Sequence, residues 1–357
     1  MIAKRLSYLT IFLVPLLPPL SAWLGNASGR ADAFAWFPLV FLFVLLPAAD
    51  YLVGLDLSNP ANDSAAEQLE KDRWFRVLTL VCVPVHLGLL AWSGWWFVHA
   101  ELGTAGKLGW LISQGVIGGV LAINVAHELI HKAGRLEPTA GGILLASVGY
   151  GTFRVEHLRG HHVHVSTPLD ASSAPFGQNV YAFVLQSVPR NIANAWRLEA
   201  ERLTRRGLRW WHWRNELAWW SALTVLLAVA FWAWLGAAGL GYFIAQCIGA
   251  FVSLEIINYI EHYGLERREI SPGRYERTTH LHSWNSNYLL TNRMLFQLQR
   301  HSDHHENARR RYQALRHYDA SPQLPGGYAA MFALALLPPL WFAVVNKRVP
   351  KAASDVA

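Results

Sequence analysis

Six long apolar runs constrain this chain of 357 residues more than any other feature of its sequence. Each run holds about 20 mostly apolar residues, enough for a helix to cross the roughly 30 Å hydrocarbon core of a bilayer. A single soluble core could not bury six such helices. The sequence therefore predicts an all-α integral membrane protein, one membrane-embedded domain over residues 1–357 with six transmembrane helices. We expect the spans at 8–24, 34–50, 78–98, 108–129, 217–236 and 242–260.

The first apolar run and a seventh, shorter one each leave an alternative open. Lys4 and Arg5 precede the first run, as they would in a signal peptide. That run is long, lacks a small-residue cleavage site and leads into further spans, so we interpret it as a retained helix. The seventh run, 328–345, contains Pro338 and Pro339 in its middle. These prolines favour an interfacial or re-entrant helix over a seventh span.

Positive charge is concentrated in two polar segments. Of the 31 Lys and Arg residues, 24 lie in 132–214 and 267–351. Cytoplasmic loops carry an excess of positive charge, so we place the segments 132–216 and 261–357 in the cytoplasm, with the N-terminus inside. No basic stripe with stacking aromatics stands outside this membrane pattern, which argues against nucleic-acid binding. The mixture of Arg and Trp in 191–214 suits a helix in the membrane interface; a plain solvated helix is the alternative.

Nine of the 16 histidines gather in four short motifs, at 127–132, 156–162, 258–264 and 299–305. Residues at i, i+3 and i+4 share one face of a helix, so we expect His127 and His131 to point the same way, and His157 to point with His161. Imidazole is the commonest protein ligand for iron and zinc. Nine imidazoles are too many for one tetrahedral zinc, and suit two metals with four or five ligands each.

The positions of the motifs support a single assembled site. His127 and His131 end the fourth predicted span, His262 ends the sixth, and the other two motifs lie in the two cytoplasmic segments. All nine rings can therefore meet at one depth, just inside the cytoplasmic face.

Other readings of the histidines remain open. His-Glu-x-x-His at 127–131 also marks zinc proteases, in which the Glu is the base. A metal transporter would place its histidines along a path through the spans. His86 and His99, in the third span, are interpreted as core residues. Any of the remaining histidines could support the ligands, and their roles stay open: His164, His212, His280, His282 and His317.

At these motifs the chain resembles the membrane-bound alkane 1-monooxygenases, within the wider fatty-acid desaturase/hydroxylase superfamily. The resemblance covers nearly the whole chain and is densest over 124–328. Its most discriminating part is Asn258-Tyr259-Ile260-Glu261-His262-Tyr263-Gly264, which simple desaturases lack. The stretches 275–277, 282–287 and 311–317 also look like that family.

The resemblance implies a six-helix fold with a di-iron centre in the bacterial inner membrane, facing the cytoplasm. The implied reaction is terminal hydroxylation of an n-alkane with O₂ and two electrons. The implied electron donor is a rubredoxin, reduced by an NAD(P)H-dependent rubredoxin reductase. The implied iron ligands are His127, His131, His157, His161, His162, His262, His301, His304 and His305.

The two cysteines, Cys82 and Cys247, both lie inside apolar runs and read as small buried hydrophobes. A rubredoxin needs four iron-ligating cysteines, so we expect no fused rubredoxin here and a separate protein as the electron donor.

Acidic residues beside the histidines are candidates for supporting the ligands. A ligating histidine usually donates its second N–H to a carboxylate or carbonyl, which fixes the ring. The alternative for each is an ion pair with a neighbour such as Lys132, Arg159 or Arg300. Glu255 lies inside the sixth span, where an ionisable group is costly and often functional; pairing with another helix is its alternative. The full set of candidates is Glu128, Glu156, Glu255, Glu261 and Asp303.

Two further enzymatic readings accompany the leading one. A sister enzyme could hydroxylate the methyl group of an alkylated aromatic such as xylene. A membrane lipid desaturase or hydroxylase is disfavoured by the element around His262. Basic residues such as Arg309, Arg310 and Arg311 could dock an acidic electron carrier, although contact with lipid headgroups explains them equally well.

Overall fold

The computed structural model describes residues 2–350, and its first four apolar segments are helical as predicted. Helical backbone runs over Ile2–Ser28, Ala31–Val53, Arg73–His99 and Thr104–Ile130, which are long and apolar enough to cross a membrane. Three of these segments contain changes of helix type. The first segment consists of α1 (Ile2–Ser7), η1 (Tyr8–Phe12) and α2 (Leu13–Ser28), and the second of α3 (Ala31–Phe34), α4 (Phe37–Val40), η2 (Phe41–Leu45) and α5 (Leu46–Val53). The third is the single helix α7 (Arg73–His99). The fourth consists of α8 (Thr104–Gly118), η3 (Gly119–Ile123) and α9 (Asn124–Ile130).

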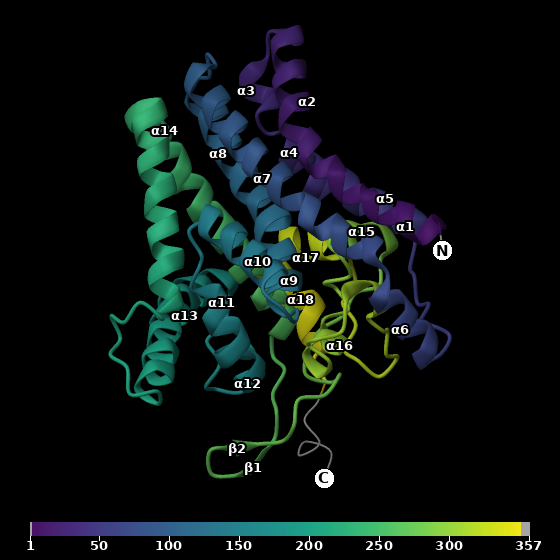
Figure 1. Cartoon of the computed structure of the whole chain (residues 1–357). Coiled ribbons are helices and arrows are strands. Elements are labelled where there is room, and N and C mark those ends of the chain that lie inside the picture. The colour runs from purple at the N-terminus through teal and green to yellow at the C-terminus, as the bar shows by residue number, and fades with distance from the viewer. Residues whose placement is uncertain (1, 351–357) are drawn as a thin grey trace.

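The fifth and sixth predicted spans form the two arms of a hairpin within α14 (Glu216–His262). A straight helix of 47 residues would be about 70 Å long, more than twice the core of a bilayer. The backbone breaks at Gly236, with φ 65° and ψ −160°. The two arms fold back on each other at this break (Figure 1). Phe231 of one arm stacks on Phe243 of the other, with ring centroids 5.3 Å apart.

Part of the polar segment 132–216 packs inside the helical bundle. Its first helix, α10 (Leu136–Ser147), contacts both arms of α14: Thr224 donates to the carbonyl of Ala146, and Gln246 to that of Ser147. The rest of the segment lies toward the opposite end of the molecule from the Gly236 break (Figure 1). It comprises α11 (Phe153–Glu156), η4 (His157–His161), α12 (His162–His164) and α13 (Val180–Thr204).

The tryptophans predicted to lie on an interfacial helix are divided between helix and loop. The helix α13 ends at Thr204, and Trp196 lies on it. Trp210, Trp211 and Trp213 follow in the loop between α13 and α14, where their side chains are exposed. The location of this region in a membrane interface stays a prediction.

The C-terminal part returns to the ends of the apolar helices through short elements. A small antiparallel hairpin, in which Glu269 pairs with Tyr275, projects from the end of the molecule opposite Gly236 (Figure 1). It is a minor exception to the predicted all-α fold. The elements of this C-terminal part are β1 (Glu269–Ser271), β2 (Arg274–Tyr275), α15 (Leu289–Met294), α16 (His301–Glu306), η5 (Tyr312–Ala314), α17 (Tyr328–Ala335), α18 (Pro338–Val345) and η6 (Asn346–Arg348). One short helix near the N-terminus, α6 (Asp63–Lys71), lies between α5 and α7.

The seventh apolar run is too short and too broken to span a bilayer. It divides into α17 and α18, each of 8 residues and therefore about 12 Å long. Pro338 starts the second of these helices. Trp341 of α18 packs on Tyr259 of α14 at a centroid distance of 5.0 Å, so this helix pair covers the end of a long apolar helix.

Candidate metal centre

The structure brings all nine histidines of the four motifs together, in two adjoining groups. Within each group of four, one nitrogen from every ring lies within 4.8 Å of the others, and every ring is buried. The first group is His127, His131, His157 and His304. The second group is His161, His262, His301 and His305.

The ninth ring, His162, adjoins the first group. Its Nε2 lies 3.0 Å from Nε2 of His157 and 3.2 Å from Nε2 of His304. Its ring centroid is also 4.5 Å from that of His305 in the second group. His162 therefore lies between the two groups, with its Nε2 directed to the first.

A π-helical turn divides the histidines of the second motif between the two groups. The α-helical spacing predicts that His157 and His161 point the same way, but η4 covers His157–His161 with the wider i to i+5 turn. As a result His157 joins the first group and His161 the second, and it is His162 that lies against His157. The prediction that His157 and His161 point the same way is therefore wrong, because the turn between them is π-helical and not α-helical.

The donor geometry fits metal ions with imidazole ligands. Nε2 atoms of neighbouring rings lie between 2.9 and 3.2 Å apart. A metal–nitrogen bond of about 2.1 Å places adjacent ligands of an octahedral ion about 3 Å apart. His127 Nε2 is buried and has no hydrogen-bond partner among residues 2–350. Burial and the neighbouring histidines hold the pKa of His157, His304 and His305 well below its usual value, which keeps their lone pairs free to bind a metal.

Asp170 is the carboxylate that sequence reasoning missed. Its Oδ2 lies 2.9 Å from Nδ1 of His161, and the Ser173 hydroxyl donates to the same oxygen at 2.6 Å. The contact fixes the ring so that Nε2 faces the other imidazoles. Asp170 lies nine residues after His161 in a loop without helical periodicity, so spacing carries no signal for it.

Of the four acidic residues inside the motifs, only Glu261 touches a ring. Its Oε2 lies 3.2 Å from Nε2 of His301, the nitrogen that faces the other rings. Glu128 instead pairs with Lys132 at 2.9 Å. Asp303 pairs with Arg310 and accepts from the backbone N–H of Arg316 at 2.8 Å.

The fourth motif carboxylate, Glu156, packs against the π-helical turn. It is buried, burial raises its pKa well above the usual value, and its Oε1 occupies the space where a side chain at residue 160 would begin. Gly160 therefore leaves the space that this carboxylate occupies against η4.

Glu255 joins a buried network that reaches the second group. It accepts a hydrogen bond of 2.5 Å from the hydroxyl of Tyr150 and one of 3.1 Å from the amide of Asn191 in α13. That amide also donates to the hydroxyl of Ser172, whose backbone N–H donates to Asp170. Glu255 therefore bonds to another helix, α13, which was one of its two alternatives. The same hydrogen-bonded network continues through Ser172 and Asp170 to His161, which links Glu255 to the histidines as well.

The other histidines and the arginine cluster lie outside the two groups. His86 Nε2 lies 3.0 Å from the Ser147 hydroxyl in the interior, as expected of a core residue. The carbonyl of His282 lies 3.3 Å from Nδ1 of His262, so it is the backbone of this residue that supports the site. Arg310 and Arg311 form ion pairs with Asp303 and Glu137, which makes both less available for a partner.

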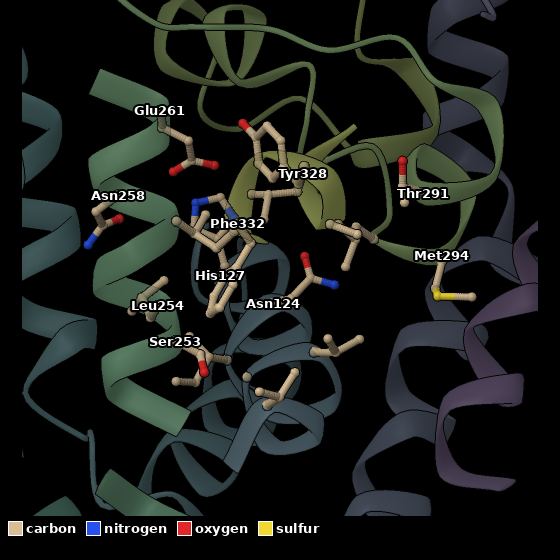
Figure 2. Close-up of a pocket in the computed structure, with 18 of the residues that line it drawn as sticks. Asn124, His127, Ser253, Leu254, Asn258, Glu261, Thr291, Met294, Tyr328 and Phe332 are labelled. Carbon is tan, nitrogen blue, oxygen red and sulfur yellow. The ribbon is translucent and has the colours of Figure 1, made fainter. Parts of the chain in front are cut away.

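An apolar pocket leads to the rings from among the long helices (Figure 2). Its walls come from η2, α8, η3, α14 and α17, with side chains such as Leu42, Val120, Leu254 and Phe332. At one end it reaches the rings of His127, His157 and His301. The site thus combines an apolar pocket with two groups of buried imidazoles that could hold metal ions.

Comparison with known proteins agrees with this combination. The family model for fatty acid desaturases matches residues 102–335. The chain is 52% identical over 350 residues to alkane 1-monooxygenase 2 of Pseudomonas aeruginosa, covering 97% of this chain and 92% of the relative. It is 49% identical over 351 residues to alkane 1-monooxygenase 2 of Alcanivorax borkumensis, covering 97% and 91%. It is 31% identical over 240 residues to the xylene/toluene monooxygenase hydroxylase component XylM of Pseudomonas putida, covering 67% and 63%.

The fold and the histidine groups therefore define a membrane oxidoreductase of the fatty acid desaturase family. Within that family, the chain belongs to the alkane 1-monooxygenases.

Proposed function

We propose that this chain hydroxylates the terminal carbon of n-alkanes, using O₂ and two iron ions held by the nine histidines. The observation that carries the proposal is the apolar pocket that begins among the long helices and ends at His127, His157 and His301. An n-alkane has no polar group, so it partitions into the lipid and can enter such a pocket only through apolar contact.

The residues of the chain supply ligands, orientation and exclusion of water. Two bound iron ions would supply the activation of O₂ and the oxidation of the C–H bond. The apolar walls would admit a linear chain end first and bring its terminal carbon toward the rings, so selectivity would follow from orientation rather than from reactivity. Asp170 fixes His161, and burial of the rings keeps water from the reacting carbon.

The membrane arrangement and the partners complete the proposal. The arms of α14 would count as two spans, which gives six transmembrane helices with the histidines at the cytoplasmic side of the bacterial inner membrane. A separate rubredoxin, reduced by its NAD(P)H-dependent reductase, would deliver the electrons. Of the three arginines considered for docking it, Arg309 has no ion pair with any residue of the described range 2–350, so it is the best candidate.

The alternative classes are each disfavoured by a specific observation. In a zinc protease Glu128 would face the metal, but it pairs with Lys132. In a transporter the histidines would be spread along a path, but they gather in one cluster. The lower identity to XylM than to the alkane enzymes favours an alkane over an alkylated aromatic.

The test is a whole-cell oxidation assay with a ladder of n-alkanes and with toluene and xylene, in cells that supply rubredoxin and its reductase. Conversion of alkanes to 1-alkanols supports the proposal. Conversion of the aromatic methyl groups alone would replace the substrate, and one zinc with no iron per chain would end the oxygenase assignment.

A further inference from the structure

Besides ring nitrogens of His127 and His301, three polar atoms of the apolar pocket lack a hydrogen-bond partner among the described residues. They are Nδ2 of Asn124, Oε1 of Glu261 and the hydroxyl of Tyr328, none of which has a hydrogen-bond partner within residues 2–350. All three side chains line the pocket, and they are only 7%, 2% and 1% exposed. We call Asn124, Glu261 and Tyr328 the polar collar.

An n-alkane cannot satisfy this collar. A buried polar atom without a partner is costly, and an alkyl chain offers it no hydrogen bond. Elsewhere the pocket wall is mostly apolar. Apart from ring nitrogens of His127 and His301, its other polar groups are satisfied within residues 2–350: the Ser253 hydroxyl, for example, donates to the carbonyl of Gly249 at 2.7 Å. The unpaired atoms therefore indicate a ligand that carries a polar group at the end nearest the rings.

The collar has the donors and the acceptor that a single hydroxyl needs. The Tyr328 hydroxyl faces the Glu261 carboxylate (Figure 2) and interacts with it directly, but too loosely for a hydrogen bond of ordinary geometry, so Oε1 of the carboxylate keeps no such partner within the described residues. An oxygen beside both groups can accept from Tyr328 and donate to Glu261. The amide of Asn124 supplies a second donor, and an alcohol has one O–H donor and two lone pairs.

The collar also lies where a hydroxyl would be formed. Asn124 is one helical turn before His127 in α9. Glu261 precedes His262, and its other oxygen, Oε2, lies 3.2 Å from Nε2 of His301. A hydroxyl held by the collar would thus be attached to the carbon that has approached the two groups of rings.

We propose that the polar collar binds the hydroxyl of a primary alcohol whose alkyl chain lies in the apolar pocket. This rests on the proposed function, in which the 1-alkanol is the product. The 1-alkanol then binds more tightly than the n-alkane of equal length, and it competes with that alkane for the pocket.

The test compares n-decane and 1-decanol on the purified full-length protein. Thermal unfolding at increasing ligand concentration gives an apparent dissociation constant for each, with both ligands expressed as mole fractions in the detergent micelle. We expect 1-decanol to bind about tenfold more tightly, which corresponds to about 1.4 kcal/mol. Tyr328→Phe and Asn124→Leu should each reduce this preference, taken as the ratio of the two dissociation constants, at least threefold.

Ser253→Ala is the matched control, because it removes a pocket hydroxyl that is already bonded, and it should keep the full preference. Equal binding of the two ligands by the native protein would overturn the inference, as would a preference that survives both Tyr328→Phe and Asn124→Leu. If neither n-decane nor 1-decanol binds, the proposed function fails together with the inference about the polar collar. Formation of 1-decanol from n-decane, measured separately, tests the proposed function alone.

Discussion

Oδ2 of Asp170 lies 2.9 Å from Nδ1 of His161, and this contact ties a loop carboxylate to the second group of rings. Asp170 is itself held by Ser172 and Ser173, and through Asn191 the same network reaches Glu255 in α14. Helices α13 and α14 therefore take part in orienting a ring that neither of them carries.

Asp170→Asn should weaken metal binding by the second group. The amide can no longer act as a charged acceptor for His161, and loss of such a partner typically costs 10- to 100-fold in metal affinity or activity. Iron per chain measured after dialysis, together with alkane oxidation, checks this. Asp319→Asn is the control, because Asp319 contacts His317 outside both groups. Equal iron retention in the two variants would show that Asp170 is not needed.

His262→Ala should abolish hydroxylation in cells supplied with rubredoxin and reductase. The change removes one ring from the second group, whose four nitrogens lie within 4.8 Å of one another. His86→Ala removes a buried ring whose single hydrogen-bond partner within residues 2–350 is Ser147, and should keep activity if the protein is made in equal amount. Full activity of His262→Ala would exclude this residue as a ligand.

Gly160→Ala should destabilise the turn that carries His157 and His161. The added methyl group would collide with Oε1 of Glu156, and overpacking of this kind costs about 1–3 kcal/mol. Gly88→Ala in α7 is the control, since a methyl there meets no atom within 4 Å. Thermal unfolding in detergent compares the two. If Gly160→Ala unfolds at the same temperature as the native protein and keeps its full iron content, Glu156 does not pack tightly against residue 160.

Glu199 of α13 should make stability depend on acid pH. Burial raises its pKa, but hydrogen bonds from Arg202, from the N–H of Glu216 and from Arg159 outweigh this and hold the pKa below its usual value. The carboxylate therefore binds protons more readily when unfolded. Its stabilising contribution is present above the unfolded pKa of about 4.3 and is lost as pH falls through the lower folded pKa.

Glu199→Gln tests this directly. The variant should lose about 1–3 kcal/mol at pH 7, because hydrogen bonds to a charged group are removed, and should then show a flatter pH profile than the native protein between pH 6 and pH 3. Unfolding midpoints over that range are the measurement. Parallel profiles for the two proteins would show that Glu199 does not titrate on unfolding.

Much of the fold could be predicted from the sequence, because membrane helices are selected by length and apolarity alone. The apolar runs 217–236 and 242–260 predict two separate spans, and the helix breaks at Gly236, the last residue of the first run. The burial of α10 could not be predicted, since its packing against both arms of α14 depends on contacts between residues about 80 to 100 positions apart, such as Thr224 with Ala146 and Gln246 with Ser147.

The candidate site was predictable as a set of rings and less so as an arrangement. Motif spacing identified all nine histidines, but not their division into groups, because a π-helical turn at His157–His161 has no clear sequence signature. Asp170 was invisible because a loop has no period, and Glu128 and Asp303 beside the rings turned out to pair with Lys132 and Arg310.

The most direct measurement is product analysis of n-octane oxidation under ¹⁸O₂ with the iron-loaded protein, rubredoxin, its reductase and NADH. The account predicts 1-octanol carrying ¹⁸O, with little oxidation at internal carbons, because the pocket brings only the chain end to the rings. No oxygenated product from any n-alkane, or product whose oxygen comes from water, would contradict it.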